Sequence, residues 1–350
     1  MSRSISARLG WQVPLASAGR FDRRRRESDR WGTGRHDPTS PERMIYPIVL
    51  ACERISNPFL MGAQMDVFLT GASGYLGGVI TEHLLAAGHH VRALARSERA
   101  AERVTALGAT AIVGDLATTE VLRAAAERAD AVVHAAVDYQ NPDMAALETL
   151  GLPAMLAGAR GKPFVYTSTG LVYPDTAAAA TEELPVDEAT AAQPYKIAGE
   201  RIVLGAAGVD GLVLRASLVH GRGGSGLLQG LAAMGRARQV VPYVGDGDQI
   251  WSAVHVDDLA ELFVHAVEKP RPGRIFNATA ADTFRLRDLA AAIAATTGAV
   301  AVPVSLEQAT ATAPALAVLA RSVWLDGSRA VAEFGWHPER PVLLEDLSGI

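Results

Sequence analysis

Three glycines spaced three residues apart constrain this chain more than any other feature. Gly71, Gly74 and Gly77 follow the apolar run 67–69 and precede a helix-forming segment. Glycine permits a tight bend, lets a pyrophosphate approach the backbone, and lets a helix pack closely on a strand. The N-terminus of that helix offers N–H groups and a partial positive charge to phosphate. The pattern predicts a dinucleotide-binding turn; the alternative is a purely structural loop, because three glycines in seven residues also occur in plain loops.

Strand-like and helix-like segments alternate downstream of this turn. Strands are expected at 90–95, 111–113, 131–136, 164–167 and 212–215, with helices at 75–88, 97–107, 119–129, 144–159 and 195–207. This rhythm predicts an α/β fold, a Rossmann-type doubly wound parallel sheet with helices on both faces. After residue 217 the rhythm loosens. We therefore expect a nucleotide-binding domain at 65–217 and a smaller C-terminal substrate lobe at 218–350, partly interleaved with the main sheet.

The first 64 residues differ from the rest of the chain. They hold 11 arginines against six acidic residues, and they lack apolar periodicity before Met44. We expect this region, 1–64, to be a disordered extension. A mis-assigned start codon is our preferred explanation, because Met61 and Met65 lie directly before the first expected strand.

Composition excludes several classes of function. Residues 65–350 carry 22 basic and 32 acidic residues, which argues against nucleic acid as a partner. The sequence contains no run of 18 apolar residues, so it does not predict a membrane span. The single cysteine, Cys52, cannot form an internal disulfide, and the nine histidines show no metal-ligand spacing. We expect a cytoplasmic protein that acts on a small molecule and binds no metal, membrane or nucleic acid.

Several motifs appear together in a fixed order. They are the glycine turn, 114–116 (Gly-Asp-Leu), 134–136 (His-Ala-Ala), 165–173 (Val-Tyr-Thr-Ser-Thr-Gly-Leu-Val-Tyr), 214–215 with 220–221, and 255–258 (His-Val-Asp-Asp). In this order and spacing the chain resembles the extended and atypical-extended short-chain dehydrogenases/reductases, often labelled NAD-dependent epimerase/dehydratase. The resemblance covers roughly residues 65–345. Proteins with related folds often pair through two helices that flank the main sheet, so a homodimer is possible.

The resemblance implies a nicotinamide cofactor along one edge of the sheet. It implies that the pyrophosphate turn includes Ser73, Tyr75 and Leu76 with the three glycines, that Asp115 and Leu116 lie by the adenine, and that Ala135 and Ala136 lie toward the nicotinamide. An NAD-preferring site places an acid at the end of the second strand. Arg96 and Ser97 stand there instead, offering a forked cation and a hydroxyl to a 2′-phosphate. We therefore expect NADP, with NAD possible; the alternative is that Arg96 is a solvated arginine opening a helix.

The catalytic residues implied by the resemblance are incomplete. Thr169 stands four residues before Tyr173, where the family places the Ser or Thr that holds the substrate oxygen, and Lys196 matches the lysine that binds the nicotinamide ribose. The family's acid/base tyrosine lies four residues before that lysine, where this chain has Ala192, while Tyr195 is adjacent to Lys196. Adjacent helical residues point about 100° apart. The proton donor stays open between Tyr195, a loop tyrosine such as Tyr139 or Tyr173, and no tyrosine at all.

The substrate-facing residues argue against a nucleotide sugar. Trp251 stands about where relatives that act on nucleotide sugars carry an arginine, and His220 stands where many have a tyrosine. With Tyr139, these residues are our candidates for a pocket of modest polarity. We expect an NAD(P)-dependent oxidoreductase acting on a small carbonyl or alcohol. The alternatives are a non-catalytic NADP-binding sensor and, third, a nucleotide-sugar epimerase or dehydratase.

Overall fold

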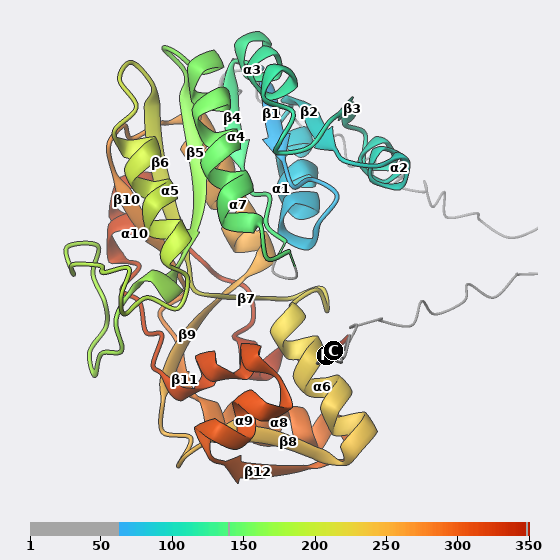
Figure 1. Cartoon of the computed structure of the whole chain (residues 1–350), viewed down its shortest axis with the longest axis vertical. Coiled ribbons are helices and arrows are strands. Elements are labelled where there is room, and N and C mark those ends of the chain that lie inside the picture. Colours follow the sequence, from blue (N-terminus) through green and yellow to red (C-terminus); the bar gives the residue numbers. More distant parts are fainter. Residues whose placement is uncertain (1–62, 139–140, 348) are drawn as a thin grey trace, which may run out of the picture. The chain divides into compact units, whose positions relative to one another are not determined.

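A seven-stranded parallel sheet organises the larger lobe of the computed structural model, which describes residues 63–138, 141–347 and 349–350 (Figure 1). The expected extension at 1–64 lies outside these residues except for its last two. Neighbouring strands run β10-β6-β5-β4-β1-β2-β3, and every pair is parallel. The strands are β1 Asp66–Thr70, β2 His90–Ala95, β3 Thr110–Val113, β4 Ala131–His134, β5 Pro163–Thr169, β6 Asp210–Ala216 and β10 Ile275–Ala278. The fold class expected from the sequence is confirmed.

Helices cover both faces of this sheet (Figure 1). One face carries α1 Tyr75–Ala86, α2 Glu98–Ala106, α7 Val256–Glu268 and α10 Ser328–Phe334. The other carries α3 Thr119–Arg128, α4 Met144–Gly158 and α5 Pro194–Leu204. Ser97 caps α2 by accepting a hydrogen bond from Ala100 N at 3.2 Å.

The two faces of the sheet are filled by alternate residues of each strand. In β1, Val67 and Leu69 pack toward α1 and α7, whereas Phe68 packs toward α3 and α4. In β4, Val133 and Val132 divide in the same way. Because both faces are covered, each strand reads as a continuous apolar run rather than as an alternation of apolar and polar residues.

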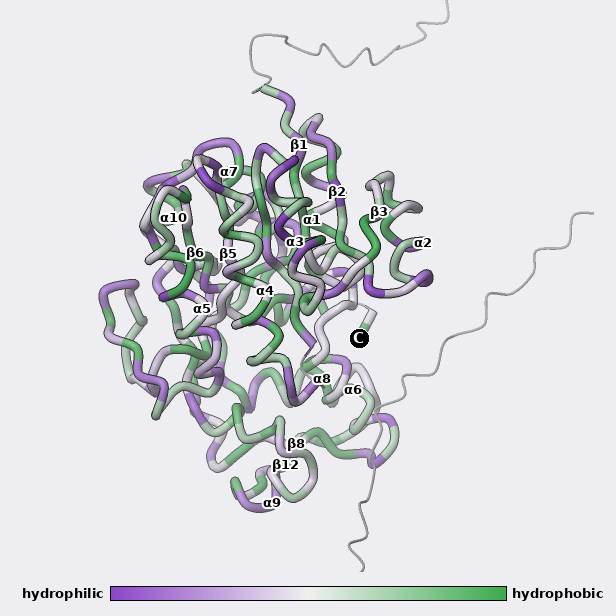
Figure 2. Tube along the Cα trace, turned by 45° about the horizontal axis from the view of Figure 1, so that its top comes forward, coloured by the Kyte–Doolittle hydropathy of each residue, from purple (hydrophilic) through white to green (hydrophobic). Residues whose placement is uncertain are grey.

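The smaller lobe holds two short sheets and a separate core. One sheet has the order β11-β9-β7 and the other pairs β12 with β8. Its elements are β7 Leu218–His220, α6 Gly226–Arg238, β8 Val240–Val244, β9 Ile250–His255, β11 Thr283–Arg285, α8 Leu286–Thr297, β12 Val300–Val304 and α9 Leu306–Thr312, with short 3₁₀ turns at Gly170–Val172, Pro314–Ala320 and Leu343–Glu345. The hydropathy-coloured trace shows β8 as strongly apolar (Figure 2). Between these elements the chain returns to the main sheet as β10.

Among the described residues no helix is both long and apolar enough to cross a membrane. The longest, α4, has 15 residues and contains Pro153.

Replacing Gly77 by alanine should destabilise the fold, because an added Cβ would lie 2.2 Å from the carbonyl oxygen of Gly71. Relieving such a backbone clash costs about 1–3 kcal/mol or more. Gly226→Ala is the matched control: this glycine also lies in a helix, and nothing stands within 4 Å of its added Cβ. Urea unfolding should give a lower midpoint for G77A than for G226A, and equal midpoints would contradict the packing described.

Candidate functional site

Most of the expected cofactor residues converge at one edge of the main sheet. Gly71 follows β1, Arg96 follows β2, Ala135 follows β4, and Thr169 ends β5. Since these strands are parallel, their carboxyl ends meet at the same edge. In open α/β sheets, ligands bind outside the carboxyl ends of the strands.

The glycine turn is built on contacts that a side chain would block. Gly71 has φ +85°, and an added Cβ would lie 2.6 Å from the carbonyl of Ala135. Gly74 is the N-cap residue of α1, and no side chain accepts a hydrogen bond from the first turn of this helix. The backbone N–H groups of that turn, which includes Tyr75 and Leu76, are therefore left for a ligand. Ser73, Gly74 and Tyr75 also line a surface cleft of about 340 Å³ beside α2. The turn therefore fits the pyrophosphate of a dinucleotide.

At the expected adenosine end, a cation replaces the acid that NAD binding favours. The Arg96 side chain is 68% exposed, and its Nη1 lies 2.9 Å from Asp138 Oδ2. The Ser97 Oγ accepts from Ala100 N and thus serves the helix cap. The Asp115 carboxylate accepts from backbone N–H groups and shapes its own loop.

The apolar residues around this end divide into buried and exposed. Leu116 is buried against α3 and α4 in the sheet's core. Val113, at the end of β3, is 77% exposed and was not singled out from the sequence, although its place at a strand end was the available signal.

At the expected catalytic end, the start of α5 decides whether position 192 can serve as the family's tyrosine position. The helix begins at Pro194, so Ala192 lies before it, with its N–H donating to Leu171 O at 3.0 Å. A residue at 192 therefore does not share a helical face with Lys196. The Lys196 ammonium lies 5.4 Å from the centre of the Tyr195 ring, so the structure brings these adjacent residues together. Thr169 Oγ1 accepts from Leu171 N at 3.2 Å.

Lys196 is buried in a polar network that the sequence did not reveal. Its Nζ donates to Glu148 Oε1 at 3.0 Å and to Thr167 O at 3.1 Å, and the Tyr166 hydroxyl also donates to Glu148. Burial lowers the pKa of Lys196, while Glu148 opposes that change. Burial, followed by the Lys196 charge, lowers the pKa of His134 to about 3. Glu148 lies in a strongly apolar helix, and its single charge there was the only sequence signal.

A second buried pair fixes Tyr173. Glu200 accepts two hydrogen bonds from the Arg215 guanidinium, at 2.9 and 2.6 Å. The Arg215 guanidinium lies 4.7 Å from the centre of the Tyr173 ring, and the Tyr173 hydroxyl donates to Asn277 Oδ1 at 2.9 Å. Burial raises the pKa of Tyr173. This hydroxyl is engaged in the core, which argues against Tyr173 as the proton donor.

The three expected substrate residues have different outcomes. Trp251 is buried, and its Nε1 donates to Arg321 O at 2.7 Å, so its surroundings are those of a core residue rather than of a substrate pocket. The prediction for Trp251 depended only on its position in the sequence. The residue lies inside β9, a strand that we did not expect from the sequence. Tyr139 lies outside the described residues. His220 is buried edge-on against His255 and lines a cavity of about 100 Å³.

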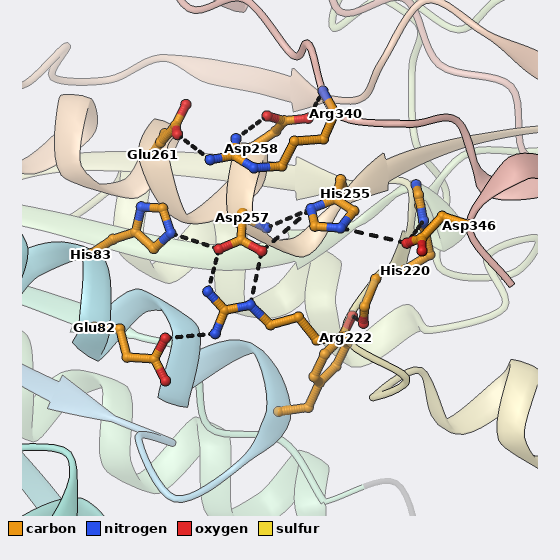
Figure 3. A network of polar contacts seen from close by, with 12 residues as sticks. Glu82, His83, His220, Arg222, His255, Asp257, Asp258, Glu261, Arg340 and Asp346 are labelled. Atoms are coloured by element: carbon orange, nitrogen blue, oxygen red, sulfur yellow. Dashed lines mark hydrogen bonds and ion pairs between the residues drawn. The ribbon is translucent and has the colours of Figure 1, made fainter. Parts of the chain in front are cut away.

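A charged network ties the loop after β7 to helix α1 (Figure 3). Arg222, with φ 50°, donates to Asp257 at the start of α7 and to Glu82 in α1. His83 Nε2 lies 2.9 Å from the same Asp257 carboxylate. Beside them, the Tyr75 hydroxyl donates to Gly221 O at 2.6 Å. This loop is thus held against the residue that opens α1, next to the glycine turn.

Titration in this network is dominated by burial and close charges. Burial raises the pKa of Asp257, but hydrogen bonds from Arg222 and His83 outweigh it and lower that pKa to about 2. Burial and His255 lower the pKa of His220 to about 4, against the opposing charge of Asp346. His220 therefore stays neutral and Asp257 stays ionised well below neutral pH.

No group of three or more histidine, cysteine or acidic side chains suited to a metal ion occurs among the residues that the structure describes.

Known proteins resemble this chain over most of its length. A family model described as the NAD dependent epimerase/dehydratase family matches residues 67–279. An uncharacterized protein of Saccharomyces cerevisiae is 30% identical over 81% of this chain and 98% of its own. A 4-hydroxy-2-methyl-3-oxo-4-farnesyl-3,4-dihydroquinoline-1-oxide ketoreductase of Stigmatella aurantiaca is 31% identical over 67% of this chain and 74% of its own. The structure of a UDP-glucuronic acid 4-epimerase from Bacillus cereus aligns with TM-score 0.67 at 18% identity, over 81% of this chain and 97% of that one.

Asp257→Asn should lower stability at neutral pH and change its acid dependence. The folded pKa of Asp257, about 2, lies below its ordinary 3.8, so its contribution is present above pH 4 and is lost as pH falls toward 2. We expect D257N to be about 2 kcal/mol less stable at pH 7, with the gap to wild type closing between pH 4 and 2. Asp282→Asn, at an exposed carboxylate, is the control. Denaturant unfolding at several pH values measures this, and a constant gap would contradict it.

Proposed function

Because the chain belongs to the NAD-dependent epimerase/dehydratase family, we propose that it is an NAD(P)-dependent oxidoreductase acting on a small carbonyl or alcohol of modest polarity. The observation that carries this proposal is the glycine turn, where Gly71 and Gly77 leave room for no side chain beside an uncapped helix end. The similarity to a ketoreductase supports a carbonyl as the reacting group.

We propose NADP as the preferred cofactor. The pyrophosphate would lie on the turn 71–77, and Arg96 would pair with a 2′-phosphate in exchange for its exposed contact with Asp138. An exposed ion pair of this kind contributes about 0–1 kcal/mol, so a doubly charged phosphate displaces it at little cost. The nicotinamide supplies or accepts the hydride.

The chain's own groups would orient the substrate. Thr169 ends β5 at the cofactor edge, and its hydroxyl hydrogen is free to donate to a substrate oxygen while its Oγ1 accepts from Leu171 N. We propose Tyr195 as the proton donor, because it is half-buried at the start of α5 and its ring lies beside the Lys196 ammonium. A tyrosine beside a cation is a suitable arrangement for general acid/base chemistry.

The rival function is a non-catalytic NADP-binding sensor. One observation favours it: the Lys196 ammonium already donates to Glu148 and Thr167 within the chain. A sensor would bind NADPH tightly and turn over no aldehyde or ketone in a broad panel, whereas an oxidoreductase would consume NADPH with some of them.

Wild-type protein should bind NADPH at least tenfold more tightly than NADH. Arg96→Glu should weaken NADPH binding by 10- to 100-fold and leave NADH nearly unchanged, because only the 2′-phosphate meets the reversed charge. Arg123→Glu, on the exposed surface of α3, makes the same charge change as a control. Fluorescence titration gives both dissociation constants; tighter NADH binding by the wild type would refute the NADP preference.

Thr169→Val should lower kcat/KM for any carbonyl substrate found in the panel by 10²–10³-fold, because it removes one hydrogen-bond donor to the reacting oxygen. The dissociation constant of NADPH should stay within twofold. Tyr195→Phe should remove most turnover, and its rate should lose the pH dependence of proton donation. Unchanged rates in T169V would show that another group holds the oxygen.

A further inference from the structure

Lys196 is anchored entirely by its own chain, directly behind the cofactor edge. The residue is 5% exposed, and its Nζ lies 3.0 and 3.3 Å from the two oxygens of Glu148 and 3.1 Å from Thr167 O. Thr167 precedes Thr169 by two residues at the end of β5. The position of the ammonium is thus set by one carboxylate and one carbonyl.

Glu148 itself is held in a space made for it. It is 2% exposed on α4, and the Tyr166 hydroxyl donates to its Oε1. An added Cβ on Gly199 would lie 2.1 Å from the Tyr166 hydroxyl oxygen and 3.2 Å from Glu148 Oε1. Glycine at this place in α5 lets the tyrosine–glutamate pair reach Lys196. Three elements of the protein, α4, β5 and α5, therefore meet at one carboxylate.

A buried ammonium depends on its counter-charge. Burial disfavours the charged form of lysine, and an adjacent carboxylate opposes that effect. The titratable groups that face Lys196 come from β4, β5, α4 and α5, and they are His134, Tyr166, Glu148, Tyr195 and Glu200. Of the two carboxylates, only Glu148 contacts the ammonium, since Glu200 is engaged with Arg215 and Ser168.

We propose that Glu148 is a positioning residue: its carboxylate keeps Lys196 charged and fixes the ammonium against the end of β5, so that cofactor affinity depends on a residue that does not touch the cofactor. This inference rests on the proposed function, because it requires that the protein binds a dinucleotide and that Lys196 helps to hold it.

Glu148→Gln tests the proposal, because glutamine keeps the size of the side chain and loses its charge. NADPH dissociation constants should be measured from pH 6 to 9. The wild type should show a flat profile. E148Q should bind near wild-type strength at pH 6 and at least tenfold more weakly at pH 9, as Lys196 loses its proton. Lys196→Met should bind weakly at every pH. Glu127→Gln, on exposed α3, is the control and should match the wild type.

Two further variants separate positioning from a purely structural role. Tyr166→Phe removes a hydrogen bond to Glu148 but no charge, so its pH profile should stay flat. Glu148→Asp keeps the charge at a shorter reach, and we expect several-fold weaker binding that is independent of pH; it carries the test if E148Q does not fold. Wild-type affinity in both Glu148 variants, or a flat E148Q profile, would overturn the inference. A wild type that binds neither NADPH nor NADH would instead overturn the proposed function, and the inference with it.

Discussion

The contact between three backbone segments at Gly71 sets the geometry of everything around it. The end of β1, the start of α1 and the end of β4 approach so closely that an added Cβ at Gly71 or Gly77 would lie within 2.6 Å of main-chain atoms. Glycine has no Cβ and tolerates φ +85°, so this approach is open to it and to almost no other residue. The height of α1 above the sheet, and hence the position of its N–H groups, follows from that contact.

The larger lobe was largely predictable from the sequence, because its strands and helices carry strong local signals. The expected strand 90–95 is β2 His90–Ala95, and the expected helix 119–129 is α3 Thr119–Arg128. The strands β7 and β9 were missed. They are short, they lie in a region without regular alternation, and β9 is buried on both faces through residues as different as Trp251 and Ser252.

The site was predictable only where a local motif defines it. The glycine turn and Arg96 are fixed by the strands that precede them. The partners of Lys196 were not, because Glu148 is 48 residues away along the chain and meets the lysine only after α4 and α5 pack side by side. The surroundings of Trp251 could not be read from its position in the sequence either, because they follow from the pairing of β9 with β11 and from the hydrogen bond that its Nε1 donates to Arg321 O.

The place of β10 has a consequence for how the chain is made. Strand β6 pairs with β10, which lies about 60 residues further along the chain. The face of the sheet that carries Val67 and Leu69 is covered in part by α7. When only the first half of the fold has left the ribosome, the nascent chain exposes the unpaired edge of β6 and an uncovered apolar face of the sheet. Such surfaces are prone to aggregation. The larger lobe is therefore completed only after α10, at residues 328–334, has emerged, and the two lobes mature together rather than one after the other.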